Sequence, residues 1–293
     1  MLAVVMALVA IASKQLGAAL SRPVMDSYGA LATTSERIGW AALILSIIAR
    51  PKVHTYSKTQ WIAALLLGAT IGTMMLTVYA AIARVPLGLV VAIDFLGPLS
   101  VAAFGLRRSW RLTWPVIALA GVLLLVRTSQ GWSADPLGIA LAFLGAICWA
   151  LFIILMKRIG SVFQGLEGLA ISFITAAFIT IPIGLVESGL PPAGDLLSKA
   201  AGLAILTPLL PYAMEVVVLR RLPSATFGIL ASLEPAVAAL AGFVILQQAL
   251  SMQQTLGIAC VVIASIGAVT YAVPDAAKRT DQSAAPKAAE DMP

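Results

Sequence analysis

The sequence predicts an all-α integral membrane protein with ten transmembrane helices, arranged as two inverted five-helix repeats. Of its 293 residues, 60% are hydrophobic and only 11% are charged. Soluble domains carry about 25% charged residues, so this composition is typical of a membrane protein. A second observation is the proline pair Pro86 and Pro98, which recurs as Pro223 and Pro235. The two members of the later pair follow those of the earlier pair by the same 137 residues, which indicates an internal repeat.

Ten stretches have the apolar composition of a bilayer-spanning helix, which needs about 20 residues. We expect them at 2–20, 30–49, 61–82, 86–106, 112–128, 136–156, 165–187, 200–219, 224–246 and 253–273. No cleavage motif follows the first span, so we expect it to be retained. Five spans per half is an odd number, so the second half enters the membrane from the opposite side. The expected units are a first repeat at 1–130, a second repeat at 131–273 and a disordered cytoplasmic tail at 274–293.

The net charge of +6 reflects topology rather than a nucleic-acid partner. With the N-terminus in the cytoplasm, thirteen basic residues fall in the inner loops and tail and four in the outer loops. The positive-inside rule then places both termini in the cytoplasm and the 187–199 loop in the periplasm. We therefore expect a multi-pass protein of the inner (plasma) membrane.

Enzyme and metal chemistry are not indicated by the motifs. The sequence contains neither a P-loop nor an H-E-x-x-H motif, and His54 is its only histidine. Cys148 and Cys260 both fall inside spans, where packing is the usual role of a small polarizable side chain. We expect no enzyme activity, no cofactor and no metal site. A membrane scaffold is not favoured either, because a scaffold would not need acidic residues at mid-membrane depth, such as Asp94.

Charged residues inside the apolar spans of the first half are the first candidates for a site. Each costs about 3 kcal/mol on insertion scales, so it usually faces a cavity or a partner. Lys14 lies about 20 Å along the first span, where it either snorkels to the outer interface or enters a transport cavity. Arg37 and its neighbour Glu36 point about 100° apart, so each needs a partner on another helix. Asp94 lies about 12 Å below the outer turn, near mid-membrane, and Tyr79 is a candidate to line the cavity.

The second half supplies two further acids beside helix-breaking prolines. Pro208 and Pro211 come just before Tyr212 and Glu215, and a helix break there would free carbonyl groups beside a cavity. Glu234 directly precedes Pro235 and has two interpretations: a charged group of the site, or a cap for the polar groups exposed at the break. In the third span, Gly68 and Gly72 have the small-xxx-small spacing that permits close helix contact.

Several of these segments resemble a known family. VPLGLVVAIDFLGPL at 85–99 and LPYAMEVVVLRRLPSATFGILASLEPAVAALAG at 210–242 are similar to the threonine/homoserine exporter branch of the drug/metabolite transporter superfamily, built from two EamA-type repeats. IASKQLGAALSR and ICWALFIILMKR match in placement. The resemblance implies a ten-helix inner-membrane exporter of small metabolites, driven by the proton gradient. Two departures are Asp94, where the family usually has glutamate, and Lys14, where an uncharged residue is expected.

We therefore expect a proton-coupled exporter of neutral amino acids such as threonine and homoserine, working by alternating access, with the lipid bilayer, protons and a small molecule as its partners. The residues expected to bind substrate are Lys14, Arg37, Tyr79, Asp94, Tyr212, Glu215 and Glu234. Asp94 and Glu234 are also expected to carry protons, although Asp94 has a competing interpretation as the permanent partner of Lys14 or Arg37. The alternative function is export of drugs, nucleobases or other small organic solutes, which would depend on the aromatic residues Trp40, Tyr79, Trp149, Tyr212 and Phe227.

Overall fold

The computed structural model describes residues 2–104, 113–128, 131–132, 135–163, 165–188, 194–221, 230–231, 233–248, 251–264 and 266–267. Within these ranges the protein is helical, apart from short connections and a two-stranded antiparallel hairpin of β1 (Arg127–Thr128) and β2 (Gly131–Trp132). Six helical stretches are long and apolar enough to cross a membrane by length and composition, and shorter apolar helices accompany them. The structure thus fits a multi-pass, all-α membrane protein.

Most helices lie within or overlap the predicted spans, and several of them, such as those of the first, third and sixth spans, extend beyond the predicted ends. The first half contains α1 (Leu2–Tyr28), α2 (Ala30–Ala49), the short 3₁₀ helix η1 (Val53–Thr55), α3 (Lys58–Ile82), α4 (Leu87–Asp94), α5 (Leu96–Phe104) and α6 (Thr113–Val126). The second half contains α7 (Pro136–Val162), α8 (Glu167–Ser188), α9 (Gly194–Ala204), the π-helical turn η3 (Ile205–Leu209), α10 (Leu210–Arg221), α12 (Glu234–Leu246) and a final helix, Met252–Ala264. The expected disordered tail at 274–293 and Phe227 lie outside the described residues.

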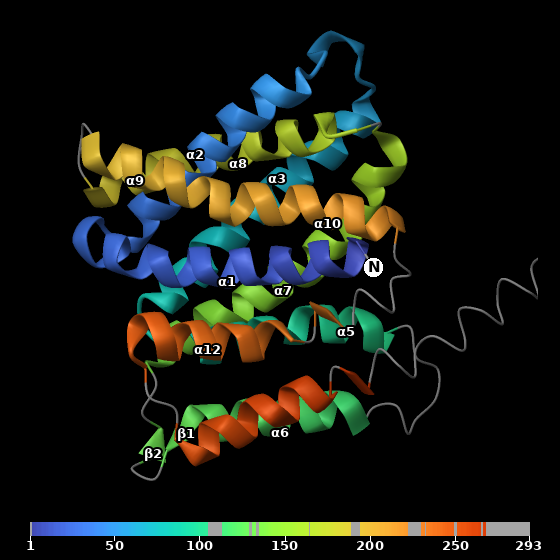
Figure 1. The fold of residues 1–293 in the computed structure, drawn as a ribbon. Coiled ribbons are helices and arrows are strands. Elements are labelled where there is room, and N and C mark those ends of the chain that lie inside the picture. Colours follow the sequence, from blue (N-terminus) through green and yellow to red (C-terminus); the bar gives the residue numbers. More distant parts are fainter. Residues whose placement is uncertain are drawn as a thin grey trace, which may run out of the picture.

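Helix α1 occupies the middle of the arrangement. It runs between α10 on one side and α12 on the other, although these helices are far from it in sequence (Figure 1). Helices α2, α3 and α8 lie on the α10 side of α1, α9 leads into α10 through η3, and α6 and the final helix lie beyond α12. Because α1 belongs to the first half and contacts α10 and α12, a side chain near its centre can meet groups from the second half of the chain.

Small residues bring α3 and α8 into close contact, as the Gly68 and Gly72 spacing predicts. A Cβ atom added at Gly68 would lie 2.4 Å from the backbone oxygen of Ser172 on α8. The Ser172 hydroxyl in turn donates to the backbone oxygen of Ala64, 3.0 Å away. Gly72 is packed less tightly, because its added Cβ would lie 3.3 Å from the side chain of Thr180. The prediction that this motif serves helix packing is confirmed.

Two membrane helices are interrupted near their middle. The expected span 86–106 is divided into α4 and α5 at Asp94 and Phe95. Pro98 has no N–H to donate to the carbonyl of Asp94, which accounts for this break. The second interruption is at Thr207, whose backbone is extended (φ −161°, ψ 122°) just before Pro208. The break expected from Pro208 and Pro211 is therefore confirmed.

Candidate binding cavity

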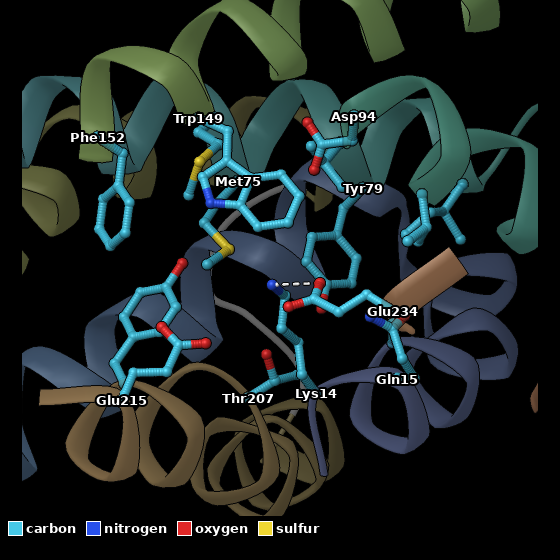
Figure 2. Close-up of a pocket in the computed structure, with 16 residues that line it drawn as sticks. Lys14, Gln15, Met75, Tyr79, Asp94, Trp149, Phe152, Thr207, Glu215 and Glu234 are labelled. Atoms are coloured by element: carbon cyan, nitrogen blue, oxygen red, sulfur yellow. Dashed lines mark hydrogen bonds and ion pairs between the residues drawn. The ribbon is translucent and has the colours of Figure 1, made fainter. Parts of the chain in front are cut away.

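A cavity lies where both interrupted helices meet α1, α3, α7 and α12 (Figure 2). Apolar and aromatic side chains form much of its wall, including Met74, Met75, Trp149 and Phe152. Its polar lining consists of Lys14, Gln15, Tyr79, Asp94, Thr207, Tyr212, Glu215 and Glu234. Six of the seven residues expected to bind substrate therefore line one cavity, although they come from distant parts of the sequence.

An ion pair joins α1 to α12 across the cavity. The ammonium nitrogen of Lys14 lies 2.8 Å from a carboxylate oxygen of Glu234. The same nitrogen lies 4.2 Å from the centroid of the Trp149 ring, an arrangement in which the ring face attracts the cation. Glu234 is the first residue of α12, and the positive end of the helix dipole favours a carboxylate there. Of the two interpretations of Lys14, the structure thus supports the cavity over the outer interface.

Asp94 and Glu215 are not part of this pair. Figure 2 shows them on opposite sides of the Lys14–Glu234 contact, with Asp94 on α4 and Glu215 on α10. Asp94 is only 8% exposed, and its Oδ1 atom has no hydrogen-bond partner among the described residues. Buried polar atoms are usually hydrogen-bonded, so an unpartnered oxygen beside a cavity suits a ligand or a proton. The competing interpretation of Asp94 as the fixed partner of Lys14 is not supported, because Lys14 pairs with Glu234.

Arg37 lies behind the cavity wall rather than in it. Its side chain is buried, at 1% exposure, and does not line the cavity. Its guanidinium donates to the backbone oxygen of Thr207 at 2.7 and 3.2 Å, to the Tyr79 hydroxyl at 2.9 Å and to the Ser21 hydroxyl at 3.1 Å. It therefore joins α1, α2 and α3 to the broken turn of η3. In this structure Arg37 holds the wall in place and does not face the substrate space that was expected for it.

The two expected tyrosines line the cavity in different ways. The Tyr79 ring stacks against the Arg37 guanidinium, whose central carbon is 4.2 Å from the ring centroid. Tyr212 packs against Phe152 and Phe173, with ring centroids 5.4 and 5.9 Å apart. Both rings are thus held by neighbours. Trp40, expected only for the alternative function, is absent from the cavity lining.

Sequence reasoning missed other lining residues, among them Gln15, Thr207 and Phe152. A signal existed for Thr207, because it directly precedes Pro208 in the interrupted helix. Gln15 follows Lys14 in a span otherwise rich in small apolar residues. Phe152 has no distinguishing feature in an apolar span. Cys148 and Cys260 are free thiols, and Cys148 is buried, as expected for a packing role.

A cavity that holds an ion pair and two further carboxyl groups, within a bundle of apolar helices, is typical of a membrane transporter of small solutes. The model of the EamA-like transporter family matches residues 136–270. The chain is 37% identical over 268 residues to the threonine/homoserine exporter RhtA of Escherichia coli strain K12, covering 91% of this chain and 90% of that one. It is 36% identical over 273 residues to the same-named protein of Salmonella typhimurium strain LT2, with the same coverage. The protein therefore belongs to the EamA-like transporter family, as its sequence segments predict, and is a transporter rather than an enzyme.

A solved structure supports the same fold. It is described only as the crystal structure of a protein, and it aligns with a TM-score of 0.62 over 92% of this chain and 97% of its own. The sequence identity is 19%, so this likeness concerns the fold alone.

Proposed function

We propose that this protein exports threonine, homoserine and similar neutral amino acids across the inner membrane. The observation that carries the proposal is the cavity in which Lys14 and Glu234 place a cation and an anion side by side with two further carboxyl groups. A neutral amino acid is a zwitterion and needs a partner of each sign once it leaves water. The relatives named for threonine and homoserine support this substrate class, because the sequence similarity spans nearly their whole length.

The proposed architecture is ten transmembrane helices in two inverted repeats, at 1–130 and 131–273. The equal proline intervals support it, as does a match to the family model that begins at 136, close to the proposed boundary. Substrate sites of inverted-repeat transporters lie at the repeat interface beside interrupted helices. Helices α4 and α5 are interrupted at Asp94 and α9 and α10 at Thr207, both of which line the cavity.

In the proposed topology both termini are cytoplasmic and residues 187–199 are periplasmic. We expect the variant Ser188→Cys, in a background with Cys148 and Cys260 replaced by alanine, to react with an impermeant thiol reagent in intact cells. The cysteine-free background serves as the control. Labelling that appears only after lysis would refute this topology.

The proposed mechanism is proton-coupled alternating access, with Asp94 and Glu234 as the proton-carrying groups. A carboxylate deep in a membrane protein is costly unless it is paired or protonated. Asp94 has an unpartnered oxygen, and Glu234 is neutralised by Lys14. Protonation and substrate binding are therefore proposed to compete for these two groups, which would link export to the proton gradient.

The test is uptake of labelled threonine and homoserine into inverted membrane vesicles, in which the cytoplasmic face points outward. An imposed gradient with an acidic interior should drive uptake, and an uncoupler should abolish it. Glu234→Gln keeps the shape of the side chain and removes its charge, so we expect uptake to be lost. The matched control is Asp26→Asn, an acid whose side chain is 61% exposed. Normal transport by a well-expressed Glu234→Gln variant would leave only the capping role for Glu234.

The second candidate function is export of drugs, nucleobases or other small organic solutes. The favouring observation is that Tyr79, Trp149 and Tyr212 all line the cavity. These rings already contact Arg37, Lys14 and Phe152, respectively, which leaves them less free to stack on a ligand. In the vesicle assay, a nucleobase or an aromatic drug that competes better than excess threonine would favour this alternative.

A further inference from the structure

Glu234 and Trp149 have the geometry of a binding site for an ammonium group, and the ammonium group of Lys14 occupies that site in this structure. The Lys14 nitrogen is held by a carboxylate oxygen at 2.8 Å and by the Trp149 ring at 4.2 Å. A carboxylate and an aromatic face are the two groups that best bind an organic ammonium. Figure 2 shows this contact inside the cavity, with Trp149 and Glu234 approaching Lys14 from different helices.

The two partners differ in how firmly they are held. The Glu234 side chain is 2% exposed, whereas that of Lys14 is 23% exposed and reaches the contact on a flexible stem. Glu234 also begins α12, which limits its freedom to move. Lys14 is therefore the partner that can swing away while the carboxylate and the ring stay in place.

From this geometry we infer that a zwitterion inserts into the ion pair, its ammonium replacing that of Lys14 on Glu234 and Trp149 and its carboxylate binding the displaced Lys14. The inference rests on the proposed function and specifies its site. One ion pair is replaced by two, so no buried charge is left without a partner. Arg37 takes no part, because neutral oxygens already hold it behind the wall.

Lys14 then acts as a specificity-determining residue that selects amino acids against amines. An amine without a carboxylate would bring a second cation beside Lys14 and offer it no anion in return. Truncation of Lys14 should reverse this preference. Lys14→Ala removes Cγ, Cδ, Cε and Nζ, the same heavy atoms as those of n-propylammonium, and leaves Glu234 without a cation.

The test compares threonine with 1-amino-2-propanol, which has the ammonium, hydroxyl and methyl groups of threonine without its carboxylate. Binding to the purified protein in detergent is measured by thermal stabilisation across a concentration series. We expect the wild type to prefer threonine. In Lys14→Ala, threonine affinity should fall about 10–100-fold and the amine should become the better ligand. Lys14→Met fills the vacated space without charge and should bind both ligands weakly.

The matched control is Lys58→Ala, which removes an exposed lysine at the start of α3 and should behave as wild type. Retained preference for threonine in Lys14→Ala, or equal binding of both ligands by the wild type, would overturn the inference. If Lys14→Ala is not monodisperse, Lys14→Met decides, since unchanged selectivity for threonine there also overturns it. If the wild type binds neither threonine nor homoserine, the proposed substrate class is wrong. The inference about the ion pair is then judged from the amine alone. Binding of the amine to Lys14→Ala but not to the wild type supports it, and binding to neither protein overturns it.

Discussion

Removal of the Arg37 guanidinium should destabilise the protein substantially even though no acid is paired with it in the described structure. Arg37→Met deletes four interhelical hydrogen bonds to Thr207, Tyr79 and Ser21. Such bonds in membranes average about 0.6 kcal/mol each, which gives roughly 2.4 kcal/mol for the set. The stranded Thr207 carbonyl adds about 1–3 kcal/mol. Relief of the buried charge opposes this loss, so we expect a net cost of about 2–4 kcal/mol.

The assay is reversible unfolding of the purified protein in mixed micelles, with the free energy of unfolding extrapolated to zero denaturant. Arg37→Lys should fall between wild type and Arg37→Met, because one ammonium keeps the charge but cannot span all three acceptors. The control Ile48→Ala truncates a side chain on the same helix that is 61% exposed, and it should cost much less. An Arg37→Met protein as stable as wild type would refute the reasoning. The free energy cost of burying the guanidinium would then equal the stabilisation that its hydrogen bonds provide.

Three further predictions concern other sites. Asp94→Asn should abolish gradient-driven uptake while preserving exchange of internal for external substrate, because the amide cannot carry a proton; a stable variant with undiminished gradient-driven uptake would exclude Asp94 from coupling. Gly68→Val should cost about 1–3 kcal/mol by forcing α3 away from the Ser172 backbone, measured by denaturant unfolding beside Thr70→Val on the exposed side of α3; equal losses in both would contradict the packing argument. The hydrogen bond from Arg84 holds the pKa of Asp135, at the start of α7, below its usual 3.8. Its stabilising effect is therefore present above that value and is lost as the pH falls through the lowered pKa of the folded state. Asp135→Ala should therefore reduce the melting temperature at pH 7, and by progressively less as the pH falls below 3.8. A difference that persists at acid pH would attribute the effect to something other than the charge.

The helical, multi-pass character of the fold was predictable because apolar stretches of spanning length are what a bilayer requires of a helix. Spans such as 30–49 and 61–82 agree with α2 and α3 to within three residues. The first span was predicted to end at residue 20, whereas α1 continues to Tyr28 through Pro23. Polar residues near a membrane surface lower the mean hydropathy without ending the helix, so hydropathy alone placed this end too early.

Most of the charged residues that line the cavity were predictable, but their pairing was not. Charges in apolar spans identified Lys14, Asp94, Glu215 and Glu234, which all line the cavity. The sequence left Lys14 with several acids as possible partners, and only the packing of α1 against α12 selects Glu234. Arg37 was misplaced for a physical reason: its positive charge suggested an anionic ligand, whereas a carbonyl freed by a broken helix holds it.

That contact between Arg37 and Thr207 has a consequence for how the protein can vary in evolution. The acceptor is a backbone oxygen, which every amino acid supplies. Substitutions at position 207 can therefore be tolerated as long as the extended backbone persists, and selection on the contact acts mainly on the arginine and on the neighbouring proline. Covariation between positions would not reveal this contact, because Thr207 takes part through its backbone oxygen and not through its side chain. A survey of covarying positions in related chains should accordingly find no signal linking 37 to 207, even where the bond itself is kept.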